Sequence, residues 1–139
     1  MIEFNYQAGF KLSNESSYAE WCRQIIDSED FTFKSVQYIF CTDEFLLDIN
    51  QEFLKHDTYT DIITFDYGVD DLIEGEIYIS VDRLKDNAMA YNVTFDEELL
   101  RVMAHGILHL CGYPDKSEEE ERIMRIKELE KMKMFHVKQ

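Results

Sequence analysis

Residues 94–115, TFDEELLRVMAHGILHLCGYPD, predict the helix around which the rest of the chain packs. Thr94 and Glu97 have the spacing of a capping box, in which each side chain accepts a hydrogen bond from a free backbone N–H group. The apolar residues that follow recur at steps of three and four, as on the inward face of a helix. That face comprises Leu99, Val102, Met103 and Gly106. We therefore expect a largely buried central helix packed on a sheet.

Two histidines of this helix are candidate metal ligands. His105 and His109 are four residues apart, so their side chains project from the same helix face. Gly112 favours a left-handed turn that ends the helix, and Pro114 prevents the helix from continuing. We therefore expect Asp115 to return beside the histidines. Two imidazole nitrogens and one carboxylate oxygen, with a fourth position open, match the ligand count of a catalytic zinc site.

Two other interpretations of these histidines remain open. They could be buried, hydrogen-bonded core residues of an amphipathic helix, although the glycine and the acid at this spacing favour a metal. The spacing also matches the metalloprotease pattern H-E-x-x-H-x-x-G-x-x-H. However, Gly106 occupies the position of the catalytic glutamate, and Asp115 occupies that of the last ligand. Without that glutamate the prediction of a peptidase is weakened, whereas the prediction of a metal is not.

Apolar alternation, helix caps and apolar stripes predict the remaining elements. The expected strands are residues 2–6, 34–41, 61–67 and 76–81, the last two joined by the acidic loop 68–74. The expected helices follow Asn14, run from Thr42 to about Lys55 and over 82–91, and follow capping boxes at Thr94 and Ser117. The buried stripe of the second helix would be Phe45, Leu46, Ile49 and Phe53. These elements predict an α+β fold with a small mixed sheet of four strands.

The composition is that of one domain, residues 1–139, with 45% hydrophobic residues available for a core. We find no apolar stretch long enough to cross a membrane and no signal-peptide pattern. Cys22, Cys41 and Cys111 are an odd, widely spaced set inside apolar segments, as expected of reduced core thiols in a cytoplasmic protein. Cys111 could be an alternative ligand, but its position two residues after His109 directs it away from the histidine face.

The stretch HGILHLCGY, residues 105–113, closely resembles the signature of the YbeY-type endoribonuclease and ribosomal RNA maturation family. Residues 57–65, DTYTDIITF, and the triplet Gly75-Glu76-Ile77 are similar to further family segments, so the resemblance covers nearly the whole chain. It implies a zinc-dependent endoribonuclease specific for single strands. Such an enzyme would act on 16S ribosomal RNA of the small subunit in the cytoplasm, with ribosomal or assembly proteins as further partners.

The sequence departs from the family pattern at two positions. Asp115 stands where many members have a third histidine, and aspartate is also a competent zinc ligand. Leu54 stands where the family tends to have an arginine thought to act on the RNA phosphate. Lys55 or His56 could replace that arginine. Together with Asp61, which could instead cap the turn before a strand, they are our candidates for catalysis.

The charge distribution is unusual for a protein that binds RNA. The net charge is −15, whereas RNA affinity depends on neutralising phosphates with Lys and Arg. Residues 122–139 carry six basic and two acidic side chains, but residues 1–121 carry 8 basic and 27 acidic ones. This leaves room for a local cationic strip or for docking through a protein partner. It also supports an alternative, a ribosome-assembly binding factor with a structural metal.

Overall fold

The computed structural model describes residues 1–53 and 60–135, with only the backbone of Phe53. The strands in this part of the chain are β1 (Ile2–Tyr6), β2 (Thr32–Cys41), β3 (Ile62–Asp66) and β4 (Leu72–Ser80). The helices are α1 (Glu15–Ser28), α2 (Asp43–Phe53), α3 (Val81–Tyr91), α4 (Phe95–Leu110) and α5 (Glu118–Met132). None of these helices is long and apolar enough to span a membrane.

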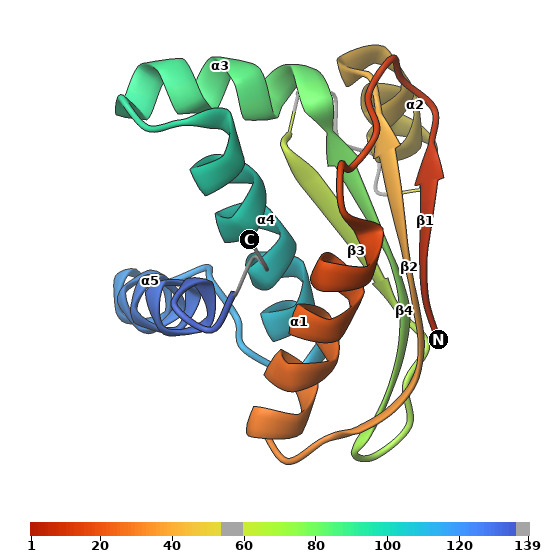
Figure 1. The fold of residues 1–139 in the computed structure, drawn as a ribbon, viewed down its shortest axis with the longest axis vertical. Helices are drawn as coiled ribbons and strands as arrows, with labels where there is room; N and C mark the ends of the chain where they lie inside the picture. The colour runs from red at the N-terminus through yellow and green to blue at the C-terminus, as the bar shows by residue number, and fades with distance from the viewer. Residues whose placement is uncertain (54–59, 136–139) are drawn as a thin grey trace.

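The strands form one mixed sheet with the order β1-β2-β4-β3. β1 and β4 both pair with β2 in parallel, whereas β3 pairs with β4 antiparallel and forms one edge of the sheet. Helices α1 and α4 cover one face of this sheet, α5 packs on α4, and α2 lies on the other face (Figure 1). The prediction of an α+β fold with a small mixed four-stranded sheet is confirmed.

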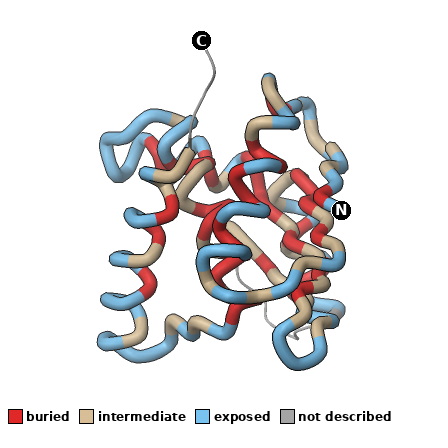
Figure 2. Tube along the Cα trace, turned by 60° about the horizontal axis from the view of Figure 1, so that its bottom comes forward, coloured by how far each residue is buried: buried red, intermediate tan, exposed pale blue. Residues whose placement is uncertain are grey.

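The main core lies between the sheet and the layer formed by α1 and α4, where the buried positions of the chain gather (Figure 2). Tyr38 of β2 is fully buried, and its hydroxyl donates a hydrogen bond of 2.9 Å to the carbonyl oxygen of Met103 in α4. Trp21 of α1 donates from Nε1 to the carbonyl oxygen of Lys131 in α5, at 2.7 Å. These two bonds satisfy buried polar atoms. The first joins β2 to α4, and the second joins α1 to α5.

The capping box predicted at the start of α4 and the turn predicted at its end are confirmed. Thr94 and Glu97 form the complete capping box, as do Ser117 and Glu120 at the start of α5. Gly112 has φ +97°, the left-handed conformation that favours glycine. The N–H of Gly112 donates to the carbonyl of His109, and that of Tyr113 donates to the carbonyl of Leu108. This pair of bonds is a Schellman motif, and it turns the chain back along the helix.

Gly106 allows α4 to approach the sheet closely. A Cβ atom at this position would lie 2.8 Å from Cγ2 of Ile77 in β4 and 3.1 Å from Cδ1 of Ile62 in β3. Gly106 thus faces the sheet, as predicted, together with the buried side chains of Leu99, Val102 and Met103. A glutamate at this position, as in the metalloprotease pattern, would have its side chain directed into the core.

Three details of the predicted elements are wrong. β2 begins at Thr32, and β4 begins at Leu72 inside the predicted loop 68–74, because Thr32 pairs with Leu72 and Phe33 with Ile73. Phe45, predicted as a buried residue of α2, is 39% exposed and stacks on Tyr78 with ring centroids 6.4 Å apart. The second core cluster, under α2, is small: Cys41, Leu46, Ile49 and Ile63. Phe45 is not among its buried residues.

Candidate metal centre

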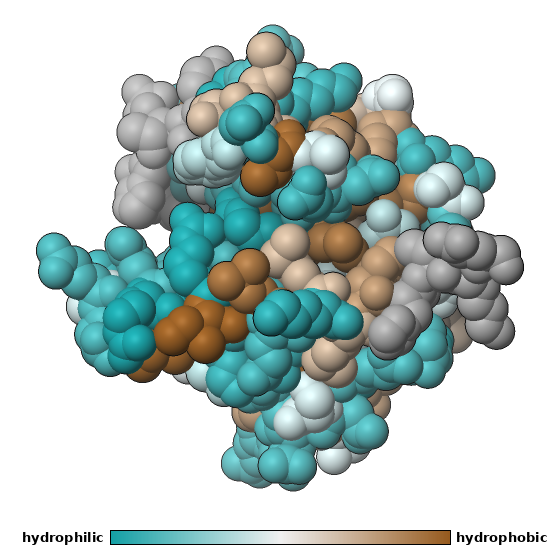
Figure 3. All heavy atoms as spheres, turned by 60° about the vertical axis from the view of Figure 1, so that its left-hand side comes forward, coloured by the Kyte–Doolittle hydropathy of each residue, from teal (hydrophilic) through white to brown (hydrophobic). Residues whose placement is uncertain are grey.

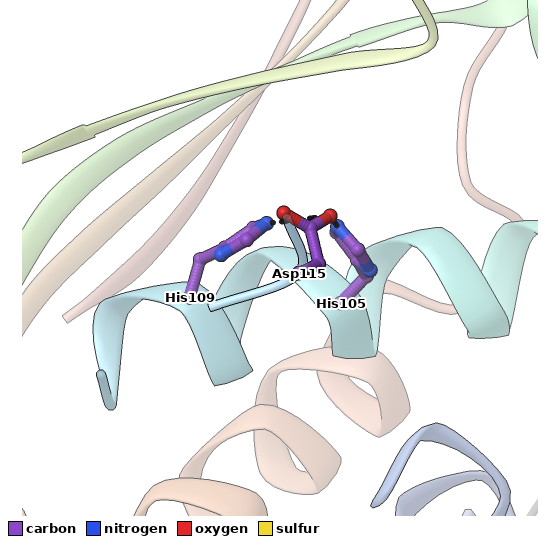
Figure 4. Close-up of side chains that lie close together, drawn as sticks. All are labelled: His105, His109 and Asp115. Atoms are coloured by element: carbon purple, nitrogen blue, oxygen red, sulfur yellow. Dashed lines mark ion pairs between the residues drawn. The ribbon is translucent and has the colours of Figure 1, made fainter. Parts of the chain in front are cut away.

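His105 and His109 stand one turn apart on α4, and Asp115 extends between their rings from the segment after the helix (Figure 4). The Oδ2 atom of Asp115 lies 3.2 Å from Nε2 of His105 and 3.4 Å from Nε2 of His109. The two ring centroids are 4.4 Å apart. The three side chains therefore converge as the sequence predicts, and they are the group in the described residues that could hold a metal ion.

The other ring nitrogen of each histidine is held by an acceptor. Nδ1 of His105 lies 2.6 Å from Oε2 of Glu128 in α5, and Nδ1 of His109 lies 2.9 Å from the carbonyl oxygen of Tyr113. A carbonyl or ionised carboxylate oxygen can only accept, so these contacts assign the hydrogen of each neutral ring to Nδ1. Each Nε2 then carries a lone pair. Buried acceptors that fix this tautomer are a common feature of histidine ligands in metal sites.

The arrangement fits a divalent cation. With neutral rings, two Nε2 lone pairs face an oxygen of Asp115, so electron-rich atoms face one another at 3.2 and 3.4 Å. This arrangement is favourable only with a proton or a cation among them. Burial, reinforced by the neighbouring His105, lowers the pKa of His109 and favours its neutral form. Two imidazoles and one carboxylate are ligands that zinc accepts.

Glu128 connects His105 to a network of buried charges. It is 1% exposed, and Arg101 donates to it from Nη1 at 3.3 Å. Burial alone would raise the pKa of Glu128, but the hydrogen bond from His105 and the charges of Arg101 and Arg125 lower it, so the carboxylate is ionised. Arg101 also makes a bidentate contact with Glu98, at 2.9 and 2.7 Å.

The three candidate ligands line a cleft of about 380 Å³ between α4, β3, the C-terminal end of α3 and the middle of α5. Asp61, a predicted catalytic candidate, lies in this cleft with Oδ2 3.6 Å from Nη2 of Arg101. Burial raises the pKa of Asp61 above its ordinary value, against the opposing charge of Arg101. The other residues that line the cleft are Thr60, Ile62, Thr64, Tyr91, Arg101 and Arg125.

The structure places only some of the remaining predicted residues. Leu54, Lys55 and His56 lie outside the residues that the structure describes, so their roles stay predictions. Cys111 packs in the main core, where burial raises the pKa of its thiol to about 12. It is therefore a protonated core thiol, and all three cysteines are free and buried, as predicted.

The sequence analysis missed several residues that line the cleft or contact its histidines. The sequence does place Arg101 on the same face of α4 as the two histidines, because positions 101, 105 and 109 are four residues apart. Helical periodicity could therefore have identified it. Glu128, Arg125 and Tyr91 come from other helices. Their approach depends on how α3 and α5 pack on α4, which no local sequence pattern encodes.

Comparison with known proteins assigns the chain to a family. A family model described as Endoribonuclease YbeY matches residues 3–136. The chain belongs to the YbeY family. Relatives named Endoribonuclease YbeY include that of Flavobacterium psychrophilum, 53% identical over 100% of this chain and 99% of the relative. The protein of the same name from Flavobacterium johnsoniae is 54% identical over 100% of both chains.

A solved structure supports the fold of this YbeY family member. The solution structure of TM1509 from Thermotoga maritima is 30% identical and superposes with a TM-score of 0.70. The match covers 97% of this chain and 89% of that one. The segment that matches the YbeY family model includes His105, His109 and Asp115, together with the two residues whose oxygens accept from the histidine rings.

Proposed function

We propose that this chain is a metal-dependent endoribonuclease that cuts single-stranded RNA during maturation of small-subunit (16S) ribosomal RNA. Membership of the YbeY family, whose model carries the description Endoribonuclease, supports the reaction. The observation that carries the proposal is the convergence of two Nε2 atoms and one carboxylate oxygen in an open cleft. Residues 1–139 would act as one hydrolase domain, in the cytoplasm, on the small subunit and its ribosomal or assembly proteins.

We infer that the metal is one Zn²⁺ ion held by His105, His109 and Asp115. When bound, such an ion supplies a Lewis acid that can activate water and polarise a phosphoryl oxygen. The protein's own contribution is to hold the ligands in place. Glu128 and the carbonyl of Tyr113 keep both histidines in the tautomer that leaves Nε2 free, at 2.6 and 2.9 Å. Asp115 comes from a different segment, which the Schellman motif orients.

Asp61 is the described residue that best suits proton transfer in this proposal. Its raised pKa brings a carboxyl group closer to the range in which it can both take and give a proton near neutral pH. Arg101, 3.6 Å away, holds it on the cleft side of the β3 edge. Lys55 and His56 remain further candidates, since a cation at either position could contact the RNA phosphate.

One experiment distinguishes the proposed endoribonuclease from two other candidate functions, a peptidase and a ribosome-assembly factor. A peptidase is disfavoured because Gly106, which replaces the catalytic glutamate, is packed against Ile77. A ribosome-assembly factor with a structural metal is favoured by the net charge of −15. The experiment compares purified wild type with His109→Ala on a structured 16S RNA fragment, with and without a chelator. Arg122→Gln, on the exposed side of α5, is the control variant.

We expect wild type and Arg122→Gln to cut single-stranded segments of the RNA only without chelator, and His109→Ala to cut at least about 100-fold more slowly. Equal cutting by wild type and His109→Ala would indicate a contaminating nuclease and discard the endoribonuclease. Metal-dependent cutting of casein, or RNA binding without cutting, would point instead to the peptidase or to the assembly factor.

A further inference from the structure

We infer that Tyr91 and Arg125 form a binding site for one nucleotide of single-stranded RNA beside the metal centre. The nucleobase stacks on the ring of Tyr91, and its phosphate contacts the guanidinium of Arg125. The inference rests on the proposed function, because it takes RNA as the substrate. It assigns substrate-binding roles to two residues on α3 and α5, which the sequence analysis did not single out.

Tyr91 is an aromatic residue without a structural role in the described part of the protein. It is the last residue of α3, lines the cleft that holds His105 and His109, and is 57% exposed. Its ring makes no aromatic contact and its hydroxyl no hydrogen bond with the described residues. An exposed aromatic face beside a reaction centre can stack on any nucleobase, which suits binding of single strands without strict sequence preference.

Arg125 is the accessible cation of the same cleft. Its side chain is 57% exposed, whereas that of Arg101 is 17% exposed and is held by Glu98 and Glu128. In the described residues, Arg125 contacts only Glu128, through Nη1 at 3.2 Å. The hydrogens on its Nε and Nη2 atoms therefore have no acceptor among the described residues. A guanidinium with free donors is suited to a phosphate, to which it can donate two parallel hydrogen bonds.

The charges of α5 distinguish Arg125 from the other basic residues of this helix. Lys127 and Lys131 contact Glu29, at 3.2 and 2.6 Å, and both serve the packing of α5 against α1. Arg122 pairs with Glu119 at 2.6 Å and does not line the cleft of the candidate metal centre. Of these four basic residues of α5, Arg125 is thus the one directed to the cleft, in a protein whose net charge of −15 disfavours other RNA contacts.

The surroundings of Tyr91 also favour a nucleobase over a charged ligand group. Met89 and Val93, on either side of it in the sequence, are 82% and 37% exposed, so the end of α3 presents apolar surface. Figure 3, with the left-hand side of Figure 1 turned forward, shows hydrophobic residues exposed among hydrophilic ones on this side of the molecule. A base plane and a phosphate are the two groups that an aromatic ring and a guanidinium with unused donors recognise together.

The test measures binding of a fluorescent eight-nucleotide single-stranded RNA by anisotropy, with chelator present so that the RNA stays intact. The variants are Tyr91→Ala, Tyr91→Phe and Arg125→Gln. Tyr67→Ala is the matched control for the aromatic, since Tyr67 is similarly exposed, at 54%, but lies outside the cleft. Arg122→Gln is the control for the arginine, one turn earlier on α5. Circular dichroism verifies that each variant is folded.

We expect Tyr91→Ala to raise the Kd at least about fivefold, and Tyr91→Phe and Tyr67→Ala to leave it unchanged, because stacking needs the ring alone. Arg125→Gln should weaken binding and make the slope of log K against log salt shallower by about 0.7, the value for one phosphate contact on a single strand. Arg122→Gln should keep the wild-type slope.

Tyr91→Ala binding as tightly as wild type, or an unchanged salt slope in Arg125→Gln, would overturn the nucleotide site. Metal-dependent cutting by wild type is measured in parallel. If wild type cuts RNA while these variants bind normally, the nucleotide site fails and the proposed function stands. If wild type neither binds nor cuts RNA, both fail.

Discussion

Glu128 of α5 places Oε2 2.6 Å from Nδ1 of His105 on α4, although the two residues are 23 positions apart. This contact joins the outermost helix to the candidate metal centre. Its acceptor is buried and ionised, because Arg101 and Arg125 also contact the same carboxylate. The orientation of the His105 ring therefore depends on how α5 packs, as well as on the helix that carries the histidine.

Glu128→Gln should lower the affinity for Zn²⁺ about 10- to 100-fold, the usual effect of removing a hydrogen-bonded carboxylate behind a histidine ligand. Competition with a chromophoric chelator measures this affinity. Glu98→Gln is the matched control, because Glu98 is equally buried and contacts Arg101 but not His105. Equal affinities in the two variants would show that the contact between Glu128 and His105 does not support metal binding.

Gly106→Glu should destabilise the protein by more than about 3 kcal/mol, because it directs a carboxylate into a packed apolar interface. The position allows little relaxation, since Ile77 is fully buried and its Cγ2 would lie 2.8 Å from the new Cβ. Urea unfolding measures the loss, with Gly9→Glu as control because the space around Gly9 is open. A stable Gly106→Glu protein with peptidase activity would contradict this account of the fold and of the missing glutamate.

Glu29→Gln should lower the free energy of unfolding by about 2 kcal/mol at pH 7, because Glu29 accepts from the buried Lys131, at 2.6 Å, and from Tyr113, at 2.6 Å. Burial raises the pKa of Glu29, but these bonds together with Lys127 outweigh it and lower the pKa in the folded protein. A carboxyl group whose pKa is lowered in the folded protein stabilises the fold at pH values above its pKa in the unfolded chain. This stabilisation is lost as the pH falls through its pKa in the folded protein.

The stability difference between wild type and Glu29→Gln should therefore be largest near neutral pH and shrink in acid. Urea unfolding between pH 3 and pH 7 measures it. Glu130→Gln serves as the control, since Glu130 also contacts Lys131, at 2.7 Å, but is 52% exposed. That variant should change the stability by less than about 1 kcal/mol. A difference for Glu29→Gln that is constant over this pH range would be incompatible with an ionised Glu29.

Features encoded by neighbouring residues could be predicted from the sequence. The capping boxes at Thr94 and Ser117, the turn at Gly112 and the return of Asp115 each depend on a few adjacent residues, and all were confirmed. The early start of β4 could not be predicted, because Leu72 is extended through pairing with Thr32, forty positions away. Glu128, Tyr91 and Arg125 were missed for the same reason, since helix packing alone brings them to the candidate metal centre.

The metal content of the purified protein tests the central claim most directly. The protein is prepared without a histidine tag, incubated with zinc, dialysed and measured by mass spectrometry, beside His109→Ala and Asp115→Asn. Circular dichroism verifies that both variants keep their helices. We predict about one zinc per chain in wild type and a large loss in each variant, because three ligands are needed to hold the ion in a site of this type. Wild type without metal, or variants with full occupancy, would contradict the claim that these three residues form a metal site.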